Sequence, residues 1–201
     1  MSTQTIAQSE LILGGQKSGK SRRAELLARQ WLDQSSAHNA VLIATAQPWD
    51  EEMHQRIARH QADRAQRVPG MATVEEPLAL AEAITQHSRA DTLVVVDCLT
   101  LWLTNLLMPA EPHPVVSDLV PNRSAAPVHN AQAATLLIAI QNAPGPVVIV
   151  GNEIGLGVIP MGREVRAFVD ALGRLNQDVA SVCSRVTLMA AGLPLTLKDA
   201  T

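Results

Sequence analysis

Eight consecutive residues near the start of the chain have the types and spacing of a phosphate-binding loop. In order they are Gly14, Gly15, Gln16, Lys17, Ser18, Gly19, Lys20 and Ser21, a complete G-x-x-x-x-G-K-S pattern. Glycines let a backbone wrap closely around phosphate oxygens, and amide groups at the start of the following helix supply a positive field. In such a loop the lysine reaches the outer phosphates and the hydroxyl ligates Mg²⁺, which are the roles expected of Lys20 and Ser21. The pattern therefore predicts a nucleoside triphosphate site.

Asp97 is the second candidate, because it directly follows the apolar run at residues 93–96. An acidic residue at the carboxyl end of a buried strand can hold Mg²⁺ and its water shell beside a phosphate-binding loop. The alternative is an ordinary strand-end carboxylate that caps the helix expected from residue 99. With the glycine-rich loop in the same chain, we expect Asp97 to have the metal or nucleotide role.

Two further features could carry chemistry, and residue types alone leave both open. His54 and His60 lie in one expected helix, where a histidine is more usually a solvated side chain. A neutral imidazole can nevertheless attack phosphorus and form a covalent intermediate. The loop at residues 152–160 follows an expected strand and is either part of the substrate site or a plain glycine-rich connector.

Strands and helices alternate in the pattern that must position these residues. Apolar runs predict strands at 11–13, 41–44, 72–75, 93–96, 147–150, 186–190 and 195–197. Helical spacing predicts helices at 20–34, 50–65, 77–86, 99–107, 130–142 and 162–182. This order predicts an α/β chain with a P-loop NTPase-like three-layer fold and a mostly parallel central sheet. We expect one domain over residues 1–201, with a flexible, proline-rich insertion at 109–130.

The composition restricts the class of protein. Of the 201 residues, 47% are hydrophobic and 17% charged, as in a globular protein, and the net charge of −3 with 2% aromatic residues gives no sign of nucleic-acid binding. Cys98 and Cys183 belong to no metal-ligand pattern and are expected to be reduced. No stretch reaches the roughly 18 apolar residues of a membrane span, and the first nine residues do not resemble a signal peptide. We therefore expect a cytoplasmic protein.

Taken in order, the motifs resemble the bifunctional adenosylcobinamide kinase/adenosylcobinamide-phosphate guanylyltransferase family of cobalamin biosynthesis, over residues 11–198. The resemblance rests on the loop at 14–21, Ala44-Thr45-Ala46, Asp50-x-Glu52-Met53-x-x-Arg56-Ile57-x-x-His60, Thr73-Val74-Glu75-Glu76-Pro77, Asp97-Cys98-Leu99-Thr100-Leu101-Trp102, Asn105-Leu106-Leu107, Asn152-Glu153-x-Gly155-x-Gly157-x-x-Pro160 and Gly173-Arg174-x-Asn176-Gln177.

The resemblance implies two reactions. The chain would phosphorylate adenosylcobinamide with ATP or GTP, and would then transfer GMP from GTP to adenosylcobinamide phosphate, giving adenosylcobinamide-GDP. A guanylylated histidine carries the GMP in this family, and the matching position is His60, three residues after Arg56-Ile57. The resemblance also implies a homotrimer and GTP contacts at Ala44, Thr45, Ala46, Gln61, Ala62, Asp63, Arg64, Glu75 and Asp97. Two alternatives are a small-molecule kinase without guanylyl transfer and a nucleotide-binding switch that controls a partner.

Overall fold

A seven-stranded sheet forms the centre of the molecule, with the strand order β3-β2-β4-β5-β1-β6-β7. The structure is a computed structural model and describes residues 5–48, 51–108 and 126–199. The strands are β1 (Ser9–Gly14), β2 (Asn39–Ala44), β3 (Ala72–Glu75), β4 (Thr92–Asp97), β5 (Val147–Val150), β6 (Arg185–Ala190) and β7 (Leu193–Asp199). All neighbouring strands are parallel except β7, which is antiparallel to β6. The expected α/β fold class with a mostly parallel sheet is confirmed.

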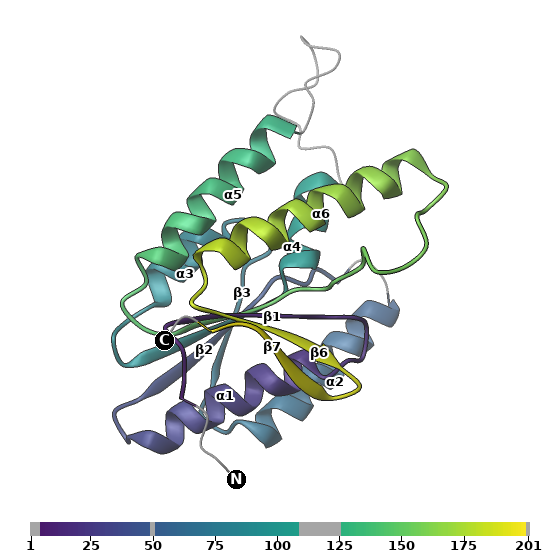
Figure 1. Cartoon of the computed structure of the whole chain (residues 1–201). Helices are drawn as coiled ribbons and strands as arrows, with labels where there is room; N and C mark the ends of the chain where they lie inside the picture. Colours follow the sequence, from purple (N-terminus) through teal and green to yellow (C-terminus); the bar gives the residue numbers. More distant parts are fainter. Residues whose placement is uncertain (1–4, 49–50, 109–125, 200–201) are drawn as a thin grey trace, which may run out of the picture.

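Helices cover both faces of this sheet and complete three layers (Figure 1). They are α1 (Lys20–Gln34), α2 (Glu51–Arg67), α3 (Leu80–His87), α4 (Leu99–Leu107), α5 (Ala126–Gln141) and α6 (Arg163–Val182). In Figure 1, α1 and α2 lie on one face and α3 to α6 on the other. Within the described ranges, no helix combines the length and the apolar character needed to cross a membrane.

The core follows from the alternation of side chains along each strand. On β1, Leu11 packs into the cluster beneath α3 to α6, where Trp102 is fully buried, whereas its neighbour Ile12 packs on the opposite side with Leu27 of α1. β4 and β5 are apolar on both faces, because each central parallel strand is covered by helices on both sides.

The starts of two helices, α3 and α5, differ from the sequence expectation. α3 begins at Leu80 rather than near Pro77, because a Glu76 carboxylate oxygen accepts the backbone N–H groups of Leu78 and Ala79 (2.9 and 2.7 Å) and holds a turn there. α5 begins at Ala126, so residues 126–130 of the expected insertion are helical, and residues 109–125 lie outside the described part. Asp50, the expected first residue of α2, also lies outside it.

A buried charged cluster connects β1, α1 and the last two strands. Glu10 on β1 is 1% exposed, and one of its carboxylate oxygens accepts hydrogen bonds from Arg23 Nη2 and Thr187 Oγ1 (both 2.8 Å). Arg185 approaches the other oxygen at 3.8 Å and is itself paired with Asp199 at 3.0 Å. Because Arg23 lies one turn after Lys20, this cluster fixes the start of α1 against the strand that leads into the glycine-rich loop.

Candidate active site

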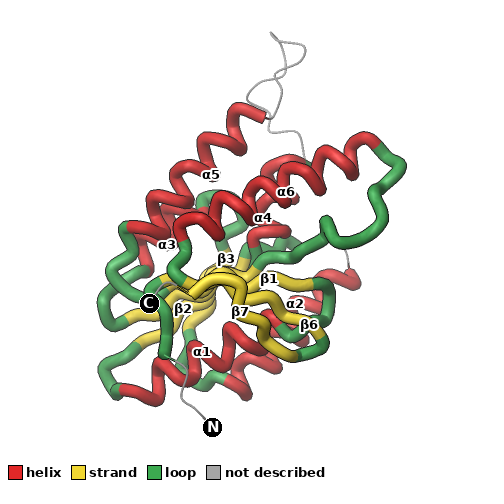
Figure 2. The backbone as a smooth tube through the Cα atoms, in the orientation of Figure 1, coloured by secondary structure: helices red, strands yellow, loops and turns green. Residues whose placement is uncertain are grey.

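The predicted site residues meet at the carboxyl edge of the parallel strands. Ala44 at the end of β2 lies opposite both Glu75 of β3 and Asp97 of β4, and Asp97 lies opposite Val150 of β5. The turn after β1 and the loop after β5 leave the sheet at this same end (Figure 2). Ligands of open parallel sheets bind outside this edge, so the arrangement supports a single site there.

The glycine-rich loop has the strand–turn–helix context that its sequence predicts. Gly14 has φ 153°, and an added Cβ would lie 2.5 Å from the Met189 carbonyl oxygen and 2.6 Å from Ser18 Oγ. Gly19 has φ 102°, which disfavours any residue with a side chain. Gly192, in the turn between β6 and β7, donates its N–H to the Ser18 carbonyl at 3.0 Å. The Ser18 hydroxyl is buried without a hydrogen-bond partner among the described atoms, as fits a loop built to receive phosphate oxygens.

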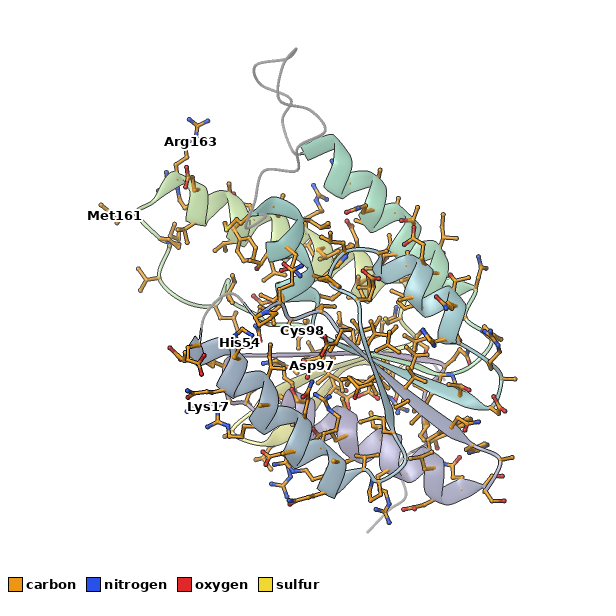
Figure 3. All side chains as sticks on the ribbon, turned by 180° about the vertical axis from the view of Figure 1, so that it is seen from behind. Lys17, His54, Asp97, Cys98, Met161 and Arg163 are labelled. Atoms are coloured by element: carbon orange, nitrogen blue, oxygen red, sulfur yellow. The ribbon has the colours of Figure 1, made fainter. Side chains whose placement is uncertain are left out.

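Lys20 lies within the loop and close to the acidic strand end. Its ammonium donates to the Gly15 carbonyl at 2.7 Å, and the residue is buried. Burial lowers the pKa of Lys20, and the charges of Cys98 and Asp97 oppose that shift. The glycine-rich loop and the end of β4 are therefore within electrostatic reach of each other, and Figure 3 shows Lys17, Asp97 and Cys98 in this part of the molecule.

The segment after β2 is fixed by buried hydrogen bonds. Thr45 Oγ1 donates to the Cys98 carbonyl and accepts from the Cys98 N–H, both at 2.8 Å. Asn105 Nδ2 on α4 donates to the carbonyl oxygens of Thr45 (2.8 Å) and Pro77 (3.1 Å). The Thr45 hydroxyl thus holds the Ala44–Ala46 segment beside Asp97. Asn105 had no expected role, although an amide in the mostly apolar segment 99–107 was the available sequence signal.

α2 carries the remaining predicted contacts, and the structure brings only some of them together. Gln61 Nε2 donates to Glu75 Oε1 at 3.3 Å, which joins two of the predicted residues. Arg64 is buried, with Nη1 at 3.4 Å from Thr73 Oγ1, and Asp63 pairs with Arg67 at 3.3 Å. Ala62 is exposed on the same helix. His60 belongs to α2, but its side chain is outside the described part of the chain.

The loop after β5 borders the glycine-rich loop and one groove. Glu153 N–H donates to the Gly14 carbonyl at 3.1 Å, and Asn176 of α6 donates to the Asn152 carbonyl at 3.0 Å. Beyond these contacts lies a groove of about 510 Å³. Its walls are Ile154, Gly155, Gly157, Val158, Ile159 and Pro160 from the loop and Arg166, Val169, Asp170, Gly173, Arg174 and Gln177 from α6. The i, i+4, i+8 spacing of Arg166, Asp170 and Arg174 was the sequence signal for this helix face.

Ser21 and Asp97 are the side chains that could hold Mg²⁺. No group of three or more His, Cys, Asp or Glu side chains gathers at one point within the described residues. Mg²⁺ does not need such a cage, because it commonly binds one or two protein oxygens together with phosphate oxygens and water. The unpartnered Ser18 hydroxyl and the position of Asp97 beside Lys20 are consistent with a magnesium–nucleotide site.

Residues 10–197 match the model of the cobinamide kinase / cobinamide phosphate guanyltransferase family. The chain belongs to this family. It is 43% identical over 189 residues to the bifunctional adenosylcobalamin biosynthesis protein CobP of Pseudomonas aeruginosa, an alignment that covers 94% of this chain and 96% of the relative. It is 34% identical over 190 residues to the bifunctional adenosylcobalamin biosynthesis protein CobU of Escherichia coli, covering 94% of this chain and 98% of that one.

A solved structure shares the fold at much lower identity. The flagellar accessory protein FlaH from Methanocaldococcus jannaschii aligns with a TM-score of 0.50 and 10% sequence identity, over 96% of this chain and 79% of that one. This likeness concerns the fold alone. The family resemblance inferred from the motifs is confirmed by the family match and the two relatives.

Proposed function

We propose that this chain is a bifunctional enzyme that phosphorylates adenosylcobinamide and then transfers GMP to the product through a guanylylated His60. The observation that carries the proposal is a complete phosphate-binding loop beside Asp97 in a chain whose residues 10–197 match the cobinamide kinase / cobinamide phosphate guanyltransferase family. The two relatives with the names CobP and CobU are described as bifunctional, which agrees with two reactions in one chain.

The first reaction is a phosphoryl transfer. The aminopropanol hydroxyl oxygen of adenosylcobinamide forms a bond to the γ-phosphorus of ATP or GTP, and the bond from that phosphorus to the β–γ bridging oxygen breaks. The hydroxyl proton leaves to solvent or to a base, and a nucleoside diphosphate departs. Lys20 would exchange the Gly15 carbonyl for phosphate oxygens and offset the charge that they carry during transfer.

The second reaction passes through a phosphoramidate. A ring nitrogen of neutral His60 bonds to the α-phosphorus of GTP, and pyrophosphate leaves. A phosphate oxygen of adenosylcobinamide phosphate then bonds to the same phosphorus, the nitrogen–phosphorus bond breaks, and adenosylcobinamide-GDP is released with His60 restored.

The nucleotide contacts in this proposal are those expected from the resemblance. Backbone groups of the loop at 14–21 would hold the phosphates, and the segment at Ala44–Ala46 with Gln61–Arg64, Glu75 and Asp97 would surround the rest of GTP. When bound, Mg²⁺ would neutralise charge on the phosphate oxygens, with Ser21 and Asp97 as its protein-side partners. Arg64 and Asp63 would have to leave their present partners, Thr73 and Arg67, to contact a nucleotide.

Two further parts of the proposal concern assembly and location. We infer a cytoplasmic homotrimer. Sedimentation equilibrium tests the assembly, since a trimer has about three times the 21.5 kDa chain mass, whereas a monomer at working concentration contradicts it.

GTP labelled at the α-phosphate tests the guanylyl transfer. Wild-type protein is expected to gain an acid-labile GMP adduct that intact-mass and peptide analysis place on His60. The His60→Ala variant is expected to gain no adduct while it still transfers γ-phosphate to adenosylcobinamide. His54→Ala is the matched control, because it removes an imidazole from the same helix and should label normally. Phosphorylation without any adduct in the wild type would leave the kinase-only alternative.

A further inference from the structure

The groove between the loop after β5 and the middle of α6 has large aliphatic side chains in its wall that are exposed to solvent. Val158 is 95% exposed and Ile159 is 78% exposed, although both have large aliphatic side chains. Arg166 Nη1 donates to the carbonyl oxygens of Pro160 (3.0 Å) and Met161, which holds this loop against α6. The apolar wall is thus presented by a braced loop, and its volume of about 510 Å³ is that of a small-molecule site, which spans ~300–1,000 Å³.

Gly173 is a second, independent observation at the same place. It lies in the interior of the 20-residue helix α6, where glycine is less favourable than alanine. A Cβ at this position would meet nothing within 4 Å, so no packing within the described chain requires its absence. Because Gly173 lines the groove, the missing side chain enlarges the space available to a ligand.

Arg174 supplies a cation next to that glycine. It lines the groove, and it makes no hydrogen bond or ion pair with any residue that the structure describes. Asp170 lies one turn earlier on the same helix face, but the two side chains form no ion pair within the described ranges. A guanidinium in a partly apolar groove is well suited to a phosphate, which it can bind through two parallel hydrogen bonds.

We propose that this groove is the acceptor site, in which the loop wall and Gly173 contact the corrin body and Arg174 binds the phosphate of adenosylcobinamide phosphate. The inference rests on the proposed function, which requires a large amphipathic acceptor that ends in a hydroxyl or a phosphate. Position supports this occupant, because the groove adjoins the glycine-rich loop through the Glu153–Gly14 hydrogen bond. In the proposed function the glycine-rich loop binds the nucleotide phosphates. The neighbouring groove is then available to the second substrate.

Equilibrium dialysis with adenosylcobinamide and with adenosylcobinamide phosphate, followed by the visible absorbance of the corrin, tests the proposal. Arg174→Gln is expected to weaken binding of the phosphate by about ten-fold or more and binding of the alcohol by less than about three-fold, since only the phosphate loses a charge-assisted hydrogen bond. Gly173→Leu is expected to weaken both, because its side chain enters the groove. In both variants the KM for GTP should stay at the wild-type value.

Two substitutions on α6 outside the groove lining are matched controls. Arg163→Gln removes a charge at the start of the helix (Figure 3), and Ala167→Leu adds the same side chain as Gly173→Leu at another exposed position. Both should bind either corrinoid as the wild type does. Unfolding midpoints of all four variants separate a lost contact from a lost fold, and Gly173→Leu should unfold no earlier than the wild type.

Several results would overturn the assignment. Equal weakening of alcohol and phosphate by Arg174→Gln would remove the phosphate role, and normal binding by Gly173→Leu would remove the groove. A rise in the KM for GTP would make the groove part of the nucleotide site. A changed sedimentation coefficient with unchanged corrinoid affinity would make it a contact between copies of the chain. Wild-type protein that binds no corrinoid would defeat the proposed function itself, whereas binding unaffected by these variants would defeat only the groove.

Discussion

The hydroxyl of Thr45 makes two buried hydrogen bonds to the backbone at the end of β4. It satisfies both the N–H and the carbonyl of Cys98, the residue after Asp97, and it is fully buried. Thr45→Val keeps the shape of the side chain but leaves both backbone groups without their partner. We expect the free energy of unfolding to fall by about 1–3 kcal/mol, measured by urea denaturation.

Thr135→Val is the control for that substitution. Thr135 is exposed on α5, and its hydroxyl bonds only to a carbonyl of its own helix. Its replacement should change the free energy of unfolding by less than about 0.5 kcal/mol. Equal effects of the two substitutions would show that the buried hydroxyl has no special role.

The two cysteines give a prediction that depends on pH. Burial raises the pKa of Cys98 to about 11 and that of Cys183 to about 12. Both thiols are therefore neutral at pH 8, and the thiolate fraction of Cys98 is about 100-fold smaller than that of an ordinary cysteine. Iodoacetamide at pH 8 should alkylate them at a useful rate only in denaturant, as followed by mass spectrometry. Rapid alkylation of native protein would contradict the burial.

The raised pKa values of the two thiols also predict how the free energy of unfolding changes with pH. A thiol whose pKa is raised by folding favours the folded state while it is protonated in both states. Above about pH 9 the unfolded thiols ionise first, so the protein should lose stability as the pH rises from about 9 toward 11.

At the scale of elements, the Glu10–Arg23 pair connects the first strand to the first helix. Removal of Arg23 leaves the buried Glu10 carboxylate with one more distant cation, Arg185 at 3.8 Å, so we expect Arg23→Met to lower the free energy of unfolding by about 3 kcal/mol. The double variant Glu10→Leu/Arg23→Met should recover part of that loss, because the orphaned carboxylate is then absent.

Arg29→Met on the same helix is the matched control. Arg29 pairs with Asp33 at 3.0 Å, but both side chains are about half exposed or more. Such a surface pair contributes at most about 0.5 kcal/mol. Urea denaturation of the single and double variants gives the free energies of unfolding that compare the buried pair with the exposed pair. A loss in Arg29→Met as large as that in Arg23→Met would show that burial is not the cause.

Elements with a clear apolar period were predictable from the sequence, and the contacts between distant elements were not. α1 and α4 begin and end where the spacing of their apolar residues predicts. The start of α3 was predicted too early, because Pro77 is compatible with a first helical turn while the Glu76 carboxylate stabilises a different turn. The hydrogen bond of Thr187 to Glu10 joins residues far apart in the chain, and no local pattern marks it.

In the candidate site, too, some residues could be predicted from local sequence and others could not. The glycine-rich loop and Asp97 have local signatures, because a close approach to phosphate and a strand end each restrict residue types. For Asn105 and Arg174 the sequence offers only an amide in a mostly apolar helix and a helical spacing of charged residues, and the partners of such side chains depend on what the fold places beside them.

For the whole molecule, the proposed nucleotide site predicts stabilisation by ligand. GTP with Mg²⁺ at about 100 times its Kd should add about 2.7 kcal/mol to the free energy of unfolding, a rise in Tm of several degrees for a chain of this length. Differential scanning fluorimetry measures the shift, which EDTA should reduce. Lys20→Ala should lose most of it, and an unchanged shift in that variant would argue against binding in the glycine-rich loop.

The position of β1 in the sheet also governs when the molecule can begin to work during its own synthesis. The phosphate-binding loop is translated before the strands that flank β1, because among the described strands β1 pairs with β5 and β6, which start at Val147 and Arg185. Until those residues emerge, a strand of apolar residues has no neighbour, and such long-range pairing is slow and exposed to misassembly. The loop is thus completed long after its own residues have been translated, when the turn at Gly192 reaches Ser18.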